Sequence, residues 1–275
     1  MPYQDIEESS HSGSPVELYT FSRGVQEWRY TSFSEDITFN NKNYTAAPIE
    51  RGKIEATPDL GKVNLKIQTV RTLDFLTQYI ASSPSDVINL VVTRFHLGDT
   101  DSTTPWRGRV TNVRFEEVEA TITCQPIYTA VKRPGLRRVY QSSCPHVLYN
   151  SPCNIIQTNY TTTAQVTAVG GNTITSPSFI INNANFGPEW FTGGMVLFTG
   201  NGVNDRRFIT DHNNSAGTIT VSLPFTDLTV GDSVSAFPGC DHTTVTCKGK
   251  FNNLNNYGGF PYIPDKNPMD GTPIF

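Results

Sequence analysis

The chain has 275 residues, a formal net charge of −4 at pH 7 and a charged fraction of 17%. A charged fraction this low, against about 25% in an ordinary domain, predicts a surface built largely from Ser, Thr, Asn and Gly. The mild negative balance provides no electrostatic basis for nucleic-acid binding. No apolar run approaches the roughly 20 residues of a membrane helix, and residues 1–15 are too polar for a secretory signal. We therefore expect a soluble protein made in a reducing cytosol.

Strand patterns dominate the first 130 residues. Aromatic residues cluster at 18–21 and 28–30, and the Asn-Asn pair between Phe39 and Tyr44 predicts a hairpin turn. Clean alternation over residues 62–67 predicts a strand with one buried and one wet face. Further strands are expected at residues 89–95, 106–115 and 117–124, the last two as an antiparallel pair around Glu116.

One short helix is expected to interrupt these strands. Thr72 is a suitable N-cap, and the helix would run for about nine residues before Pro84. Five apolar side chains would share one side of it: Leu73, Phe75, Leu76, Tyr79 and Ile80. Residues 1–135 are therefore predicted to form a β-barrel domain, closed or nearly closed, with one short helix.

Residues 164–237 carry the pattern of a small β-domain of their own. Val166–Val169, a Gly-Gly-Asn turn and Thr173–Thr175 predict a hairpin. Short strands are expected to follow at residues 195–198, 206–210, 217–223 and 233–236, which suits a small barrel or sandwich. This domain would be inserted between the two halves of a cysteine-bearing module, residues 136–163 and 238–275.

Four cysteines form two separated pairs, Cys144 with Cys153 and Cys240 with Cys247. Soft thiolate ligands select zinc or iron–sulfur centres. The spacings C-x8-C and C-x6-C are looser than a zinc knuckle, and they favour a cluster whose iron corners lie farther apart. Zinc, disulfides and free core thiols stay open as alternatives, although an odd total of five cysteines argues against a complete disulfide framework.

Three other residues have possible links to this chemistry. Cys124 shares a strand face with Ala120 and Ile122, which predicts a buried core thiol. His146 and His242 each follow the first cysteine of a pair by two residues. Each could replace a sulfur ligand, donate a hydrogen bond to the centre, or simply pack.

No sequence pattern indicates an enzyme. The chain has no G-x-S-x-G elbow, Walker loop, H-E-x-x-H helix or Rossmann fingerprint. A cysteine next to a histidine in sequence is not a catalytic dyad, because such pairs are assembled in space. We therefore expect no catalytic residues.

Several short motifs together resemble a known family. Cys144–Tyr149 reads C-P-H-V-L-Y and is followed by Cys153, and Gly239–Asp241 reads G-C-D before Thr246 and Cys247. The run continues as F-N-N at 251–253 and G-G-F-P at 258–261, and the segments 28–30, 36–38 and 44–48 also fit. The chain resembles, over nearly its whole length, the hub protein of long-tailed phage tail tips and gene transfer agents. It is similar too to the iron–sulfur tail-tip protein of phage lambda.

The resemblance implies a fold and a cofactor. It implies tail-tube-like β-barrel hub domains, three copies of which form a ring around the tail axis. It also implies a [4Fe–4S] cluster held by Cys144, Cys153, Cys240 and Cys247, with zinc as the alternative centre.

The same resemblance implies a place and a set of partners. The protein would be a structural part of the virion, at the tail tip, made in the host cytoplasm. Its neighbours would be the distal tail protein, the tape measure protein and the central tip or receptor-engaging protein, with DNA passing only in transit through the channel. Two alternatives are kept: a tail-associated cell-wall peptidase using Cys144 or Cys153, and a module that binds the host surface through residues 164–237.

Overall fold

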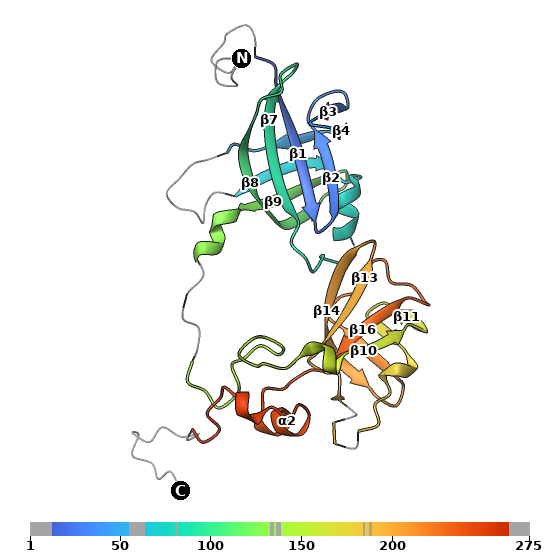
Figure 1. The fold of residues 1–275 in the computed structure, drawn as a ribbon. Helices are drawn as coiled ribbons and strands as arrows, with labels where there is room; N and C mark the ends of the chain where they lie inside the picture. The colour runs from blue at the N-terminus through green and yellow to red at the C-terminus, as the bar shows by residue number, and fades with distance from the viewer. Residues whose placement is uncertain are drawn as a thin grey trace. The chain divides into compact units, whose positions relative to one another are not determined.

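The structure is a computed structural model that describes residues 13–54, 64–80, 82–132, 135, 139–183, 185–186 and 189–263. The chain divides into two compact units. The first comprises Met1–Arg133 with Asn201–Val203, and the second comprises Pro134–Gly200 with Asn204–Phe275 (Figure 1). Among the described residues, no helix has the length and apolar character needed to cross a membrane.

The first unit is built on one nine-stranded sheet, which curls into a half-barrel. Its order is β3-β4-β2-β1-β7-β8-β9-β6-β5. Only Ala47 and Pro48 join β4 to β5 at the far end of the sheet, so the sheet must curl to bring its two ends together. The strands are β1 (Pro15–Arg23), β2 (Gln26–Thr31), β3 (Ile37–Phe39), β4 (Lys42–Ala46), β5 (Ile49–Arg51), β6 (Leu65–Val70), β7 (Asn89–His96), β8 (Ser102–Phe115) and β9 (Glu119–Pro126).

The sheet of the first unit has an apolar core on each face, so successive apolar residues of one strand can both be buried. Tyr19 and Phe21 of β1 belong to the larger apolar core, whereas Leu18 belongs to a smaller core on the other side. The 3-10 helix η1 (Asp74–Tyr79) closes the larger core, where Phe75 stacks on Phe21 with ring centroids 4.1 Å apart. Such aromatic pairs stabilise a core beyond the area that they bury.

Most predicted strands of this unit are confirmed. The Asn-Asn turn joins β3 to β4, with φ of 50° at Asn40 and 60° at Asn41, as a two-residue hairpin turn requires. β8 and β9 pair antiparallel around Glu116, and β7 and β6 also form. The alternation expected over residues 62–67 appears in β6 from Leu65 onward; residues 62 and 63 lie outside the described residues.

The predicted helix needs correction. It is a six-residue 3-10 helix, Asp74–Tyr79, and its N-cap position is Leu73, with no side-chain cap, instead of Thr72. Phe75 and Leu76 are fully buried, but Ile80 is 54% exposed. A helix this short gains little from its own backbone bonds, so the burial of Phe75 and Leu76 decides its geometry.

Glu17 forms a half-buried ion cluster in the first unit. It accepts hydrogen bonds from Arg51 Nε at 2.7 Å, Arg94 Nη2 at 3.0 Å and the Tyr19 hydroxyl at 2.8 Å. Burial opposes ionisation of the carboxyl, but these donors outweigh it and hold the pKa of Glu17 below its usual value of 4.5. The cluster therefore stabilises the fold when Glu17 is ionised.

We expect Glu17→Gln to lower the free energy of unfolding by about 2 kcal/mol at neutral pH, because it leaves two arginines without their carboxylate. A carboxyl whose pKa is lowered by folding stabilises above its unfolded pKa, near 4.5 here, and loses that contribution as pH falls further. Urea unfolding of both proteins at pH 7 and in acid measures the difference. A difference that stayed the same at both pH values would contradict this assignment.

The second unit carries a seven-stranded sheet of order β10-β16-β13-β14-β15-β12-β11. The first and last strands of this order are separated by only Val166 and Thr167, and Thr167 N donates to Thr175 O at 2.9 Å. The sheet therefore closes on itself as a small barrel around one apolar core. Its strands are β10 (Thr162–Gln165), β11 (Ala168–Gly170), β12 (Thr173–Thr175), β13 (Met195–Gly200), β14 (Val203–Asn213), β15 (Thr218–Val221) and β16 (Ser233–Phe237), which confirm the strands expected for this segment.

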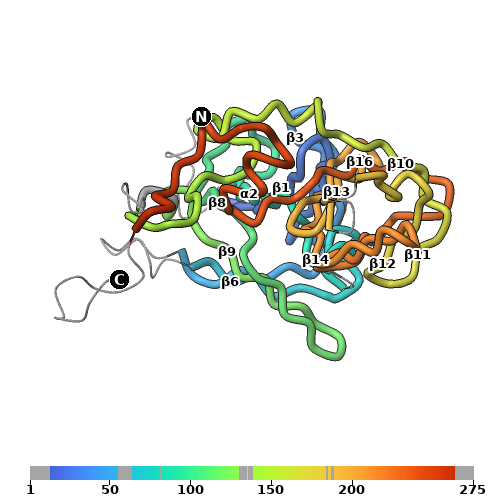
Figure 2. Tube along the Cα trace, turned by 90° about the horizontal axis from the view of Figure 1, so that it is seen from below, coloured from blue at the N-terminus to red at the C-terminus, as the bar shows by residue number. Residues whose placement is uncertain are grey.

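Short helical turns lie outside these sheets. They are η2 (Ile127–Lys132), η3 (Gln157–Tyr160), η4 (Pro177–Phe179), α2 (Thr244–Gly249) and η6 (Leu254–Asn256). The segment with α2 runs beside residues 139–160, as both Figure 1 and Figure 2 show. The two cysteine-bearing segments therefore meet, although the barrel separates them in sequence.

Candidate metal centre

The four predicted ligands line one small cavity. Cys144, Cys153, Cys240 and Cys247 all border it, together with the apolar side chains Leu148, Ile155 and Phe251. All four are free thiols, so the disulfide alternative is wrong for this structure. Two segments about 90 residues apart thus deliver four sulfur atoms to one place.

Main-chain and side-chain hydrogen bonds hold the two segments together. Cys144 N donates to His242 O at 3.0 Å, and Asn253 Nδ2 donates to Cys153 O at 2.6 Å. The Tyr257 hydroxyl lies 2.7 Å from Ser142 O and 3.1 Å from His242 O. The Cys144 and Asn253 bonds and the bond from Tyr257 to Ser142 O cross from one cysteine segment to the other, and the bond from Tyr257 to His242 O lies within the second segment. Together they fix the positions of the four cysteines.

The second pair is placed by a capped helix. Thr243 is the N-cap of α2, and its side chain accepts from Thr246 N at 3.2 Å. Asp241 in turn accepts from Thr243 N at 2.9 Å. Burial opposes ionisation of Asp241, but these donors keep its pKa below the usual value. Cys247 therefore sits on a short, well-anchored helix.

Left-handed backbone is concentrated around the cysteines. Among the described non-glycine residues with positive φ, four lie in these segments: Tyr149 at 66°, Asn154 at 55°, His242 at 64° and Asn252 at 48°. Asn and His occur in this region more often than most residues, whereas Tyr adopts it at a cost. Tyr149 is held there by its hydroxyl, which donates to Pro238 O at 2.9 Å. Locally strained backbone conformations thus orient the loops that carry the cysteines.

N–H groups lie near three of the four sulfur atoms. Gly258 N lies 3.4 Å from Cys144 Sγ, His242 N lies 3.3 Å from Cys240 Sγ, and Asn253 Nδ2 lies 3.9 Å from Cys153 Sγ. Cys247 Sγ lies 3.3 Å from Asn253 O. N–H donors stabilise a thiolate and tune the potential of an iron–sulfur cluster.

The sulfurs also disfavour one another's ionisation. Burial, and after it the neighbouring cysteine sulfurs, raise the pKa of Cys247 to about 11. The pKa of Cys240 is raised for the same reasons, against a lowering hydrogen bond from His242 N. Several thiolates can share such a site only when a cation lies among them. A reactive nucleophile needs the opposite shift, which argues against catalysis at these two positions.

The Gly-Gly of the G-G-F-P motif permits close contact with the first cysteine loop. A Cβ on Gly258 would lie 2.5 Å from the His146 ring, and one on Gly259 would lie 2.4 Å from Ser142 O. Phe260 N then donates to Gln141 O at 2.9 Å. The motif seen in the sequence therefore seals this side of the sulfur site.

The donor set suits a thiolate-bound centre, but the space among the sulfurs is small. The cavity measures about 20 Å³, roughly the space of one water. Within the described ranges, no three or more Cys, His, Asp or Glu side chains are already placed to hold a single metal ion. Binding therefore requires rotation of the cysteine side chains, inward onto one ion or outward around the larger cluster.

The structure places the two histidines at the cavity and the fifth cysteine away from it. His146 and His242 both border the cavity, and His146 Nδ1 lies 3.1 Å from Asn256 O. Cys124 lies in the first unit and is fully buried, and burial raises its pKa to about 12, as expected of a core thiol. Asn253 and Tyr257 were missed by the sequence reasoning; Asn253 belongs to the F-N-N motif, which could have indicated it.

Comparison with known proteins places this architecture in a family. Residues 16–156 match the family model described as "Baseplate hub protein, N-terminal attachment domain", which covers just over half of the chain. Residues 189–267 match "Phage conserved hypothetical protein BR0599". The second match contains Cys240 and Cys247, and the first contains Cys144 and Cys153.

One sequence relative and one solved structure are also similar. An uncharacterized protein of Xylella fastidiosa (strain 9a5c) is 29% identical over 170 residues, which cover 56% of this chain and 35% of that protein. The chain therefore spans about a third of the curated relative that it matches. A chain in the virion of a native gene transfer agent particle shares the fold, with a TM-score of 0.78, 18% identity and coverage of 98% of this chain and 94% of that one. The chain belongs to the family of baseplate hub proteins with an N-terminal attachment domain, and it is a component of the virion tail.

Proposed function

We propose that this baseplate hub protein acts as a structural ring subunit at the tip of the tail, clamped by a metal centre at Cys144, Cys153, Cys240 and Cys247. Three copies would surround the channel through which DNA leaves. The observation that supports this metal centre is the convergence of the four sulfurs on one cavity. The family match and the likeness in fold to a gene transfer agent virion chain support the hub.

The proposed cofactor is a [4Fe–4S] cluster, with a single zinc ion as the alternative. Four thiol ligands and N–H donors to their sulfurs support a cluster. The centre would join the segment before the small barrel to the segment after it. Such a cross-link closes a long loop, and its binding free energy adds to the free energy of folding.

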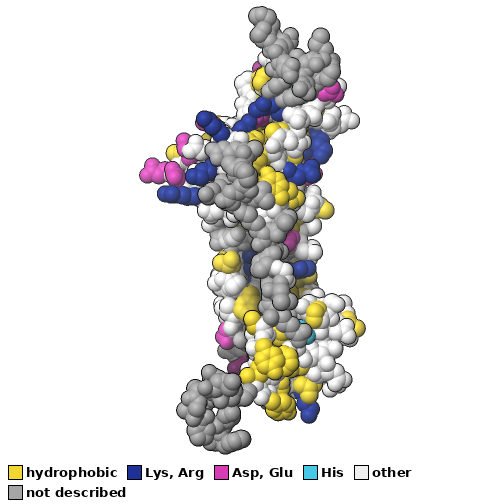
Figure 3. All heavy atoms as spheres, turned by 90° about the vertical axis from the view of Figure 1, so that its left-hand side faces the viewer, with side chains coloured by type: hydrophobic (Ala, Val, Ile, Leu, Met, Phe, Trp, Pro, Cys, Tyr) yellow, Lys and Arg dark blue, Asp and Glu magenta, His cyan; other side chains and the backbone are white. Residues whose placement is uncertain are grey.

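Exposed apolar side chains support assembly with other tail proteins. Figure 3 shows hydrophobic side chains gathered at the lower end of the view, over the cysteine-bearing segments. The exposed apolar side chains of the cysteine-bearing segments include Tyr262, at 96%, and Tyr140, Val147, Ile156 and Val245. Large exposed apolar groups of this kind mark interaction surfaces. The proposed neighbours are further copies of the chain, the distal tail protein, the tape measure protein and the central tip protein.

We expect the metal-loaded protein to form a trimer of about three times its mass of 30.4 kDa, because a closed ring needs repeated heterologous contacts. Light scattering on a sizing column, over a range of concentrations, measures this. A protein that stays monomeric when fully loaded with metal, or forms even-numbered rings, would contradict the threefold hub. Chelator-treated protein serves as the control for dependence on the centre.

A further inference from the structure

The ammonium group of Lys250 lies next to the sulfur site. Its Nζ donates to the carbonyl oxygens of Trp190 at 2.5 Å and Gly239 at 2.7 Å. The same Nζ lies 5.0 Å from the ring centroid of Trp190 and 5.6 Å from that of Phe251. Two carbonyls and two aromatic rings thus fix the ammonium group in one position.

This position adjoins a proposed ligand. Lys250 and Cys240 both line a cavity of about 420 Å³, together with Asp241 and Glu189. Cys240 also borders the smaller cavity shared by the four thiols. In addition, Gly239, which holds the lysine through its carbonyl, directly precedes Cys240 in the chain. The cation is therefore tied to the backbone of that cysteine.

A half-buried ammonium group is costly without a nearby negative charge. Burial lowers the pKa of Lys250 to about 8, while Cys240, Asp241 and Glu189 oppose that lowering. Buried charges persist in proteins where opposite charges compensate them. A centre ligated by four thiolates is a net negative charge at the right place, and it becomes more negative when reduced.

We propose that Lys250 is a positioning residue that neutralises the negative charge of the cysteine-bound centre and sets how readily that centre is reduced and released. The inference rests on the centre proposed above. It goes further in assigning a role to a residue that supplies no ligand atom. By bonding both carbonyls, the same side chain also links the segment that carries Cys240 to Trp190, which precedes β13 of the small barrel.

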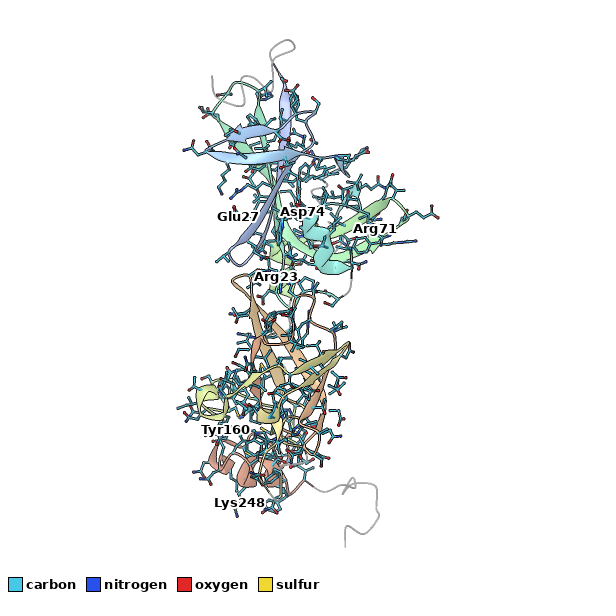
Figure 4. All side chains as sticks on the ribbon, turned by 90° about the vertical axis from the view of Figure 1, so that its right-hand side faces the viewer. Arg23, Glu27, Arg71, Asp74, Tyr160 and Lys248 are labelled. Atoms are coloured by element: carbon cyan, nitrogen blue, oxygen red, sulfur yellow. The ribbon has the colours of Figure 1, made fainter. Side chains whose placement is uncertain are left out.

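The test compares four variants of the full chain, purified without oxygen. Lys250→Met removes the charge and the donors, Lys250→Gln keeps an amide donor without charge, and Lys250→Arg keeps the charge. Lys248→Met is the matched control, since Lys248 is exposed in α2, whose C-cap is Lys250 (Figure 4). The readouts are the reduction potential of the centre and the rate at which EDTA or bipyridyl removes its metal.

We expect Lys250→Met and Lys250→Gln to disfavour the reduced state about tenfold, a potential about 59 mV lower for one electron, and to release metal about tenfold faster. Lys250→Arg and Lys248→Met should stay close to the wild type. If Lys250→Met does not fold, Lys250→Gln is compared with the wild type in its place. If the centre is zinc, which is not redox-active, the rate of metal release is the only readout compared. Unchanged potential and release in Lys250→Gln would overturn the role of the lysine alone. A wild-type chain that takes up no metal would overturn the centre itself and, with it, this inference.

Discussion

Replacing Cys240 by serine is expected to remove most of the bound metal from the purified protein. The wild type should carry about four iron atoms and matching sulfide per chain if the centre is a cubane cluster, or one zinc if it is not. Serine is a poor ligand for either, and the three remaining thiols leave the centre open. Because the binding free energy of a structural centre is folding free energy, unfolding of the second unit should become easier by at least about 3 kcal/mol.

The matched control is Cys124→Ala, which also removes a free thiol but lies in the core of the first unit. It should keep the full metal content and cost about 1 kcal/mol through a small cavity. Iron, sulfide and zinc analysis, with urea unfolding in the presence and absence of a chelator, measures both effects. Equal metal content in Cys240→Ser and wild type would refute the assignment of this ligand. A wild type free of metal after anaerobic reconstitution would refute the centre.

Adding a single methyl group at Gly239 is expected to destabilise the second unit by about 3 kcal/mol. A Cβ there would lie 1.9 Å from Thr192 O and 2.4 Å from both Gly193 C and Gly194 N. All three are main-chain atoms, so no side chain can rotate away to relieve the overlap. The shift needed would also move Cys240, and Gly239→Ala should therefore hold its metal less tightly.

Gly170→Ala is the control for this substitution, since nothing lies within 4 Å of the Cβ that it would add. It is in the same unit, on β11, and should change the free energy of unfolding by no more than about 0.5 kcal/mol. Urea unfolding followed by circular dichroism compares the two variants, and the soluble yield serves if Gly239→Ala does not fold. Equal stability of both variants would contradict this prediction, because it would show that the main chain around Gly239 can move apart to admit a methyl group without loss of stability.

The strand pattern was readable from the sequence because it depends on short-range alternation. The Asn40–Asn41 turn and the pair β8–β9 follow from residues that are neighbours in the chain. The helix at Asp74–Tyr79 was predicted in place but not in type or cap. Its geometry depends on burial of Phe75 against the distant strand β1, which local propensity does not report.

The candidate site was predicted by its atoms but not by its surroundings. Cysteine spacing and the resemblance indicated the four cysteines that meet at the cavity. Asn253, Tyr257 and Lys250, however, each make a contact with a residue 60 to about 115 positions away. Such contacts leave no periodic trace in the chain. The same holds for the close approaches at Gly258 and Gly239, where the sequence shows a glycine but not the main chain or ring beside it.

The sequence alone thus determined that this is a mainly β protein with two cysteine pairs flanking a small β-domain, because alternation and residue type are local properties. Only the tertiary structure decided that these pairs meet in one cavity, that no disulfide joins them, and which donors and which lysine surround them. The physical reason is that a site assembled from distant segments is set by packing and hydrogen bonds between those segments, which exist only once the chain has folded.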